Sequence, residues 1–238
     1  MNTPDFAIIT DHLAKRFGKA TVIHDVNLHV PTGQVYGLLG PNGAGKSTTL
    51  GLILGLLQPT SGGVELFGQP WRRDLLGRVG ASLNGPAFYG HLSAAENLEV
   101  HARLLGLKAD VVRRTLERVG LAGAGGKAAG QFSTGMKSRL ALGMALLTEP
   151  DLLILDEPQN GLDPEGIYAL RQQLRDYAGA GKTVLISSHQ LGEVQQLADV
   201  IGVLHGGTLR YQGPLAQLQA GYDSLEDAYF HLTRAGQA

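Results

Sequence analysis

The chain has 238 residues and a formal net charge of −1, with 20 Lys and Arg against 21 Asp and Glu. This length allows one α/β domain with a sizeable core, and the balanced charge argues against a nucleic-acid partner, since such proteins usually carry a basic excess. The sequence contains no cysteine, which excludes disulfides, thiol catalysis and thiolate metal sites.

Short apolar runs alternate with helical patterns along the chain. Residues 19–30 and 34–40 have the pattern of strands, and the stretch 45–57 predicts a helix. Two further strands are expected over 152–158 and 183–189, because both are short apolar runs with polar ends, as in central parallel strands.

A helical region is expected between these strands. The sequence Ser-x-x-Glu at 93–96 is a capping box and predicts a helix to about Leu105. Further helices are expected over 110–119 and 134–148. The core sheet is therefore interrupted by a helical insert that covers roughly residues 86–150.

These elements predict a single domain over residues 3–236, with an α/β core built on a parallel sheet. Residues 1–85 and 151–213 would form this core, 86–150 the helical subdomain, and 214–238 a helical tail packed on the surface.

Two nearly identical pentapeptides, GAGKS at 43–47 and GAGKT at 179–183, each resemble the end of a phosphate-binding loop. The full pattern G-x-x-x-x-G-K-[ST] surrounds phosphates with backbone N–H groups and places a helix N-terminus below them. The first pentapeptide fits this pattern, because Gly40 lies five positions before Gly45, after a predicted strand and before a predicted helix.

The second pentapeptide fails the same test. Asp176 stands where the first glycine is needed, and the segment lies after a helix and before a strand. Its glycines suit a helix C-cap and turn, and we expect Lys182 to be a solvated loop lysine. The sequence therefore predicts one phosphate loop per chain.

The predicted phosphate loop implies a nucleotide and Mg²⁺ as ligands. Lys46 would neutralise charge on the β- and γ-phosphates, and the Ser47 hydroxyl would bind Mg²⁺. The nucleotide-binding residues predicted here are Gly40, Pro41, Asn42, Gly43, Ala44, Gly45, Lys46, Ser47 and Thr48.

The segment LLILDEP, at 152–158, supplies the carboxylates that a phosphate loop requires. Asp156, at the end of the predicted strand, would hold Mg²⁺, and Glu157 would polarise the attacking water as a general base. The alternative is an ordinary strand-ending turn. No Asn-Lys-x-Asp element for reading guanine occurs in the sequence, which disfavours a GTPase.

Five ordered motifs resemble those of the ATP-binding subunits of ABC transporters, over nearly the whole chain. GPNGAGKST matches the family's P-loop, and LLILDEPQNGLDP matches its Walker B segment running into the D-loop at 160–163. QFSTGMKSRLALGMALL (131–147) resembles the signature segment, although STGM replaces the commonest form SGGQ. LISSHQ (185–190) resembles the switch-histidine segment, and Phe17 falls at the family's adenine-stacking position.

The resemblance implies the fold class, a P-loop NTPase (RecA-like) core with a parallel sheet, an antiparallel β edge and a helical insert. It also implies roles for single residues. His189 would sense the γ-phosphate, and Phe17 would stack on adenine with Val22 beside it. The alternatives are a satisfied histidine at a strand end and an ordinary core aromatic. Three further residues implied to bind nucleotide lie in the signature segment and the D-loop: Ser133, Gly135 and Asp163.

The resemblance also implies partners. ATP-binding subunits of this family pack head to tail as homo- or heterodimers, so that Ser133 of one subunit completes the ATP site of the other. An integral-membrane permease would be the second partner. Since no apolar run approaches the ~20 residues of a membrane helix, and the N-terminus is unlike a signal peptide, we expect a cytoplasmic chain held at the membrane by that permease.

Some positions depart from the family pattern. Asn84 falls where the family places a Q-loop glutamine; its shorter amide would reach Mg²⁺ through a bridging water. Phe88 and Tyr89, just after it, would either form part of the permease docking surface or pack the helical subdomain.

The form of the signature, the segment NGLDPEGI and the terminal SLEDAYFHLT are similar to bacitracin-, lantibiotic- and other ABC-2-type export cassettes. This similarity favours export over import. Two alternatives remain open: a soluble ABC ATPase without a permease, and a weakly active cassette that regulates a heterodimer. Asn84 and Thr134 favour the last of these, whereas the intact phosphate loop and Walker B carboxylates oppose it.

Overall fold

A six-stranded, mostly parallel sheet forms the centre of the protein in the computed structural model, which describes residues 5–83, 87–108 and 110–234. Its strand order is β11-β10-β4-β9-β8-β7, and only β10 and β11 pair antiparallel. The strands are β4 (Val35–Leu39), β7 (Val79–Ser82), β8 (Leu152–Asp156), β9 (Thr183–Ser188), β10 (Val200–His205) and β11 (Thr208–Pro214). β4 and β9 are buried along their whole length, as expected of strands covered on both faces.

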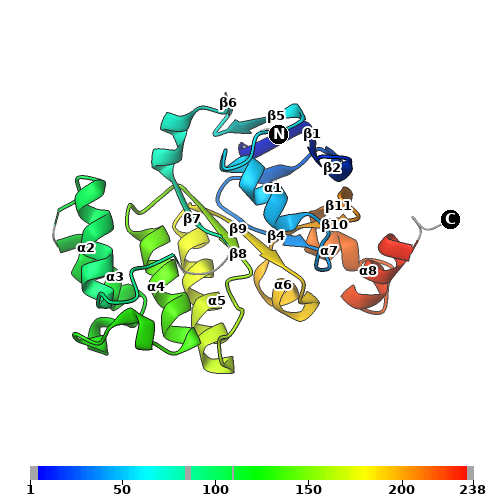
Figure 1. Ribbon diagram of the computed structural model, residues 1–238. Helices are drawn as coiled ribbons and strands as arrows, with labels where there is room; N and C mark the ends of the chain where they lie inside the picture. The colour runs from blue at the N-terminus through cyan, green and yellow to red at the C-terminus, as the bar shows by residue number, and fades with distance from the viewer. Residues whose placement is uncertain (1–4, 84–86, 109, 235–238) are drawn as a thin grey trace.

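A second sheet is antiparallel and lies above the central sheet in Figure 1. Its strands are β1 (Phe6–Phe17), β2 (Ala20–Val26), β3 (His29–Pro31), β5 (Ser61–Leu66) and β6 (Gln69–Pro70). The single strand predicted over 19–30 is therefore divided into β2 and β3. Asp25 takes a left-handed φ of 50° near the end of β2, and Thr10 of β1 bonds Val26 and Leu28 on either side of the break.

Helix α1 (Lys46–Ile53) packs its Leu50 and Ile53 into the core shared by the two sheets. This helix is four residues shorter at its C-terminus than the sequence predicts. Gly55 has a φ of +68° and lies against the Trp71 ring, and Leu56 and Leu57 both donate to the Gly51 carbonyl. The left-handed glycine ends the helix in the usual way.

The predicted insert contains three helices that gather on one side of the central sheet (Figure 1): α2 (Ala94–Leu104), α3 (Asp110–Arg118) and α4 (Thr134–Leu146). The capping box at the start of α2 is confirmed, because Ser93 and Glu96 exchange both hydrogen bonds. The loop between α3 and α4 forms two short 3₁₀ turns, η2 (Ala122–Ala124) and η3 (Ala129–Gln131).

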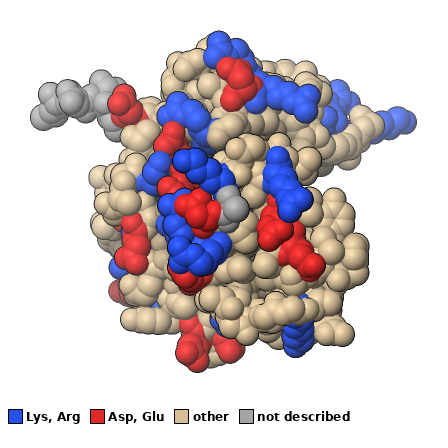
Figure 2. Space-filling model, turned by 90° about the vertical axis from the view of Figure 1, so that its left-hand side faces the viewer, with Lys and Arg blue, Asp and Glu red and all other residues tan. Residues whose placement is uncertain are grey.

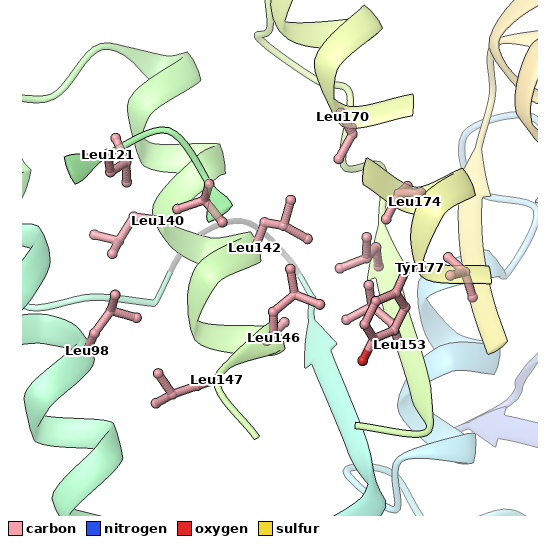
Figure 3. Packing of buried hydrophobic residues seen from close by; sticks show 14 of the residues in the cluster. Leu98, Leu121, Leu140, Leu142, Leu146, Leu147, Leu153, Leu170, Leu174 and Tyr177 are labelled. Carbon is pink, nitrogen blue, oxygen red and sulfur yellow. The ribbon is translucent and has the colours of Figure 1, made fainter. Parts of the chain in front are cut away.

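A continuous apolar cluster joins the three insert helices to the sheet and to α5 (Pro164–Gly179). Figure 3 shows Leu98 and Leu140 between α2 and α4, while Leu146 faces Leu174 and Tyr177 of α5. Each fully buried leucine contributes roughly 1.5–3 kcal/mol. The insert therefore shares its core with the central sheet.

The remaining elements complete the other end of the molecule. Helices α6 (Leu191–Leu197), α7 (Leu215–Gln219) and α8 (Leu225–Arg234) pack with β10 around a third apolar cluster. Of these, α7 and α8 lie in the segment for which the sequence predicts a helical tail. A 3₁₀ helix, η1 (Arg73–Arg78), leads into β7. In the part of the chain that the structure describes, no helix has the length and apolar character needed to cross a membrane.

The face that carries α2 and α3 is dense in charges of both signs (Figure 2). Three exposed ion pairs of i,i+4 spacing lie on these helices: Arg103–Glu99, Arg113–Glu117 and Arg114–Asp110. Exposed pairs of this kind each contribute only a few tenths of a kcal/mol. These pairs give the insert a well-solvated surface that carries both positive and negative charges.

Candidate functional site

The loop 40–47 connects β4 to α1, as the sequence predicts, and two of its glycines are required by close approach. A Cβ atom on Gly40 would lie 2.3 Å from the carbonyl oxygen of Leu204. Gly45 has a φ of +103°, and a Cβ there would lie 2.5 Å from Cδ1 of the buried Ile23. The neighbouring strands therefore hold this loop in a narrow space that only glycine fits.

Lys46 is the first residue of α1 and is only 6% exposed. Its Nζ donates to the carbonyls of Gly40 at 2.8 Å and Pro41 at 3.3 Å, so the lysine closes its own loop. The same Nζ lies 3.2 Å from Oε1 of Glu157, a half-buried carboxylate 111 positions away in the chain. A lysine and a carboxylate thus meet beside the loop.

Glu157 follows β8 directly and is held in an uncommon backbone conformation. Its φ is 49°, a left-handed value that costs a non-glycine residue of the order of 1–3 kcal/mol and occurs preferentially at functional sites. Its N–H donates to Ser187 Oγ at 3.0 Å, and that hydroxyl donates to Asp156. β9 therefore fixes the turn in which both carboxylates lie.

His189 follows β9 and reaches the same carboxylate. Its Nδ1 lies 2.8 Å from Oε2 of Glu157. β9 lies between β4 and β8 and pairs parallel with both. Because the carboxyl ends of adjacent parallel strands lie at one edge of a sheet, the loop 40–47, Glu157 and His189 meet there.

Three polar residues at this edge were missed by the sequence reasoning: Gln159, Ser187 and Ser188. Gln159 is 6% exposed, and its Nε2 donates to Ser188 Oγ at 2.7 Å and to Glu157 Oε2 at 3.3 Å. A polar side chain inside LLILDEPQNG is the only available sequence signal for Gln159. Strand pairing, which placed Ser187 opposite Asp156, could not be read from the sequence.

The oxygen ligands expected for a metal lie at the same edge. The exposed Ser47 is the second residue of α1, and Asp156 ends β8 with one oxygen bonded to Ser187. Within the described ranges, no group of three or more His, Asp or Glu residues could hold a metal ion by itself. This donor set fits Mg²⁺, which is commonly bound by one or two protein oxygens together with substrate phosphates.

The β1–β2 hairpin approaches the loop from the other sheet. A Cβ on Gly45 would lie 3.3 Å from the Val22 carbonyl, so Val22 borders the loop. Phe17, at the end of β1, is 47% exposed, and the Lys15 ammonium lies 4.9 Å from its ring centroid. Phe17 is therefore an exposed aromatic with a cation near its ring, and not a core residue.

The predicted signature segment lies against the predicted D-loop of the same chain. Ser133 is exposed and caps α4 by accepting from the Met136 N–H at 3.3 Å. Cγ2 of Thr134 lies 2.3 Å from the position of a Cβ on Gly161, and a Cβ on Gly135 would lie 3.6 Å from Leu162. Asp163 caps α5 by accepting from the Gly166 N–H at 2.8 Å.

The segment after β7 carries the predicted Q-loop residue and two aromatic side chains. Asn84 lies outside the described residues. Phe88 packs against the apolar cluster of the insert, whereas Tyr89 is half exposed and meets His91 edge-on. One of these aromatics therefore packs the insert and the other faces solvent.

Lys182 lies in the loop before β9, as expected, but it is not simply solvated, because its side chain takes part in an ion pair. Its Nζ lies 2.8 Å from Oδ1 of Asp151, whose other oxygen accepts from Arg78 at 2.7 Å. Hydrogen bonds from these two cations hold the pKa of Asp151 below its ordinary value. Lys182 thus joins the start of β9 to the turn before β8, and the GAGKT segment has a structural role.

Comparison with known proteins identifies a family match. The ABC transporter family matches residues 23–160, more than half of the chain. The chain is 44% identical to the bacitracin transport ATP-binding protein BcrA of Enterococcus faecalis, over 90% of this chain and 71% of the relative. It is 43% identical to the lantibiotic transport ATP-binding protein SrtF of Streptococcus pyogenes, over 83% and 86%.

Solved structures agree with these relatives. An ATP-binding subunit of an ABC transporter superposes with a TM-score of 0.84 at 30% identity, over 95% of this chain and 99% of that one. The expected fold class, a P-loop α/β core with an antiparallel edge and a helical insert, is confirmed.

Proposed function

We propose that Lys46, Glu157 and His189 form the hydrolytic site of this chain, which belongs to the ABC transporter family and is an ATP-binding, ATP-hydrolysing transporter subunit. The observation that carries this assignment is their convergence. Lys46 Nζ lies 3.2 Å from Oε1 of Glu157, and His189 Nδ1 lies 2.8 Å from Oε2 of the same carboxylate. All three side chains lie at the edge of the sheet beside the loop 40–47.

Each residue has one task in ATP hydrolysis. Lys46 offsets negative charge on the β- and γ-phosphates, and His189 donates a hydrogen bond to the γ-phosphate. Glu157 accepts the proton of a water whose oxygen attacks the γ-phosphorus, while the bond to the β-phosphate oxygen breaks and ADP leaves. Lys46 and His189 therefore exchange their contacts with Glu157 for contacts with phosphate when ATP binds.

Mg²⁺ would be held by the Ser47 hydroxyl and by Asp156. When bound, the ion supplies positive charge that offsets the charge developing between the β- and γ-phosphates. Ser187 donates to one oxygen of the Asp156 carboxylate, and this bond restricts the orientation of the carboxylate.

The nucleotide base and a second subunit would complete the site. Phe17, exposed at the end of β1, suits stacking on adenine, with Val22 at the loop. Ser133 and Gly135 begin α4, whose N-terminal N–H groups suit a phosphate. In one chain Thr134 and Gly135 lie against the D-loop. We infer that Ser133 and Gly135 serve the ATP of a head-to-tail partner copy, together with Asp163.

The variant Glu157→Gln tests this assignment. Glutamine keeps the volume of the side chain and accepts from Lys46, but it cannot take a proton from water. We expect kcat to fall roughly 10²- to 10⁴-fold, with ATP binding retained and an ATP-dependent dimer accumulating in light scattering. Wild-type turnover in this variant would overturn the assignment of Glu157.

A membrane permease is the proposed second partner. A groove of about 310 Å³ lies between β7 and the helices α2 and α4, and its lining includes Leu76, Leu105 and Met144. Leu105 is exposed, as is Leu104 beside it. We infer that an apolar segment of the permease docks in this groove.

Docking is tested by co-expressing the chain with its permease. Leu105→Asp would place a charge in the groove and should move the chain from the membrane pellet to the supernatant, with its own ATPase activity retained. Co-sedimentation equal to wild type would overturn the placement of the groove. A wild-type chain that never sediments would instead favour an ABC ATPase without a permease.

The direction of transport proposed is export. The relatives named above carry bacitracin and lantibiotic transport in their names, and another relative, at 37% identity, is a Nod factor export ATP-binding protein of Burkholderia lata. The chain would act at the cytoplasmic face of the membrane, and the permease would select the cargo.

A further inference from the structure

Gln159 is buried at the centre of the proposed hydrolytic site, although the mechanism above gives it no task. The amide nitrogen carries two hydrogens, and each finds an acceptor: Ser188 Oγ at 2.7 Å and Glu157 Oε2 at 3.3 Å. Burying an amide costs free energy unless its hydrogen-bond partners are held in place. Its contacts therefore define a specific geometry.

Ser188 anchors this geometry to the central sheet. It is fully buried in β9, its carbonyl accepts from the Gly40 N–H at 3.2 Å, and its hydroxyl accepts from the Gln190 N–H at 3.0 Å. Gln159 therefore bonds a serine hydroxyl that also accepts from the backbone N–H just after His189. The backbone carbonyl of the same serine accepts from Gly40, at the start of the predicted phosphate loop. The amide moves only if the edge of β9 moves.

Among the residues that the structure describes, three side chains contact the Glu157 carboxylate, and one of them can keep its contact during hydrolysis. Lys46 and His189 both exchange their contacts with Glu157 for contacts with phosphate when ATP binds. Gln159 has no phosphate to bind, because its second hydrogen is used by Ser188. The carboxylate would otherwise rotate freely at the moment when it must face water, and a displacement of about 1 Å in such a site can cost ~10²-fold in rate.

We propose that Gln159 is a positioning residue that holds Oε2 of Glu157 in place once ATP has drawn Lys46 and His189 away. This inference rests on the proposed function of Glu157. The amide suits the task because it donates to a carboxylate and does not ionise, whereas an acid at this position would repel Glu157 and an apolar residue would leave it unrestrained.

The test is Gln159→Met in the full chain, which keeps an unbranched side chain of similar length but removes both donors. We expect kcat for ATP to fall roughly 10- to 100-fold, with KM and the dissociation constant of a fluorescent ATP analogue unchanged. A purely structural role would not lower kcat while leaving KM and nucleotide affinity unchanged.

Two further variants guard against a folding artefact. Gln173→Met on α5 removes a glutamine that donates to the Arg118 carbonyl at 2.7 Å, away from Glu157, and should leave kcat unchanged. Ser188→Ala removes the anchor of Gln159 and should lower kcat in the same direction, by less than Gln159→Met. The thermal midpoint of each variant reports whether it is folded.

The double variant Glu157→Gln/Gln159→Met separates the two proposals. If Gln159 acts through Glu157, the second substitution should not slow the residual turnover of Glu157→Gln further. A folded Gln159→Met protein with wild-type kcat would overturn the positioning role alone. Wild-type turnover in Glu157→Gln would overturn the proposed hydrolytic site, on which this role depends.

Discussion

The segments GAGKS and GAGKT differ at one residue out of five, yet they occupy opposite environments in the same protein. In the first, Ala44 and Lys46 are buried, and the lysine begins a helix at the edge of the sheet where β8 and β9 also end. In the second, Ala180 is exposed at the end of α5, and Lys182 precedes β9 at the other end of that strand.

The difference lies in what surrounds each central glycine. Gly45 and Gly181 both have a positive φ, of +103° and +81°. Around Gly45 the neighbouring strands leave no room for a Cβ, whereas a Cβ on Gly181 would meet nothing within 4 Å. The same residue thus shapes a phosphate loop in one place and ends a helix in the other.

The charged partners differ in the same way. Lys46 meets a carboxylate in a half-buried site, where electrostatic interactions are strong. Lys182 meets Asp151, whose side chain is 41% exposed, so water screens the pair. A shared local sequence therefore specifies a shared backbone turn, while burial determines what its lysine can do.

The largest effect that separates the two segments is expected from their lysines. Lys46→Ala should lower kcat for ATP roughly 10²- to 10³-fold, because the variant loses a positive charge aimed at the transferred phosphate. Phosphate release from the purified chain measures this. The matched variant Lys182→Ala should leave turnover unchanged, and an equal loss in both variants would contradict the assignment of a single phosphate loop.

The two glycines should give an intermediate effect. Gly181→Ala costs about 1–2 kcal/mol of folding free energy, because alanine disfavours a left-handed backbone. Gly45→Ala carries a similar cost and also a clash with Ile23, for which overpacking adds about 1–3 kcal/mol. Urea unfolding measures both, and only Gly45→Ala should lose ATP binding.

A rescue variant sharpens the comparison of the glycines. Ile23→Val removes the Cδ1 atom that a Cβ at position 45 would meet at 2.5 Å. In the Gly45→Ala background it should therefore restore part of the stability, although it would weaken the wild-type core. If the double variant is as unstable as the sum of the single ones, the clash with Ile23 does not cause the loss.

The smallest effect is expected from the ion pair of the second segment. Since Lys182 and Arg78 lower the pKa of Asp151 in the folded state, its stabilising contribution is present above the unfolded pKa and is lost as pH falls through the folded one. Lys182→Met should cost about 0.2–1 kcal/mol near neutral pH and little under strongly acidic conditions. Urea midpoints at the two pH values measure this difference, and a pH-independent cost would point to lost packing instead.

Much of the site could be read from the sequence because its signals are local. The spacing from Gly40 to Lys46 and the apolar run before Asp156 each lie within one element and its turn. The end of α1 was placed too late, because the left-handed turn at Gly55 packs against the Trp71 ring, a distant contact that the sequence does not show. The ion pair of Lys182 was missed for the same reason, since its partner Asp151 lies 31 positions away.

The sequence by itself predicted one phosphate loop, followed by a carboxylate pair and a histidine at the ends of two buried strands. Only the tertiary structure decided that these groups meet, and that Gln159 joins them. The physical reason is the strand order: β9 lies between β4 and β8, so residues 46, 157 and 189 come to one edge of the sheet. Local patterns specify turns and strands, whereas the neighbours of a side chain depend on which strands pair.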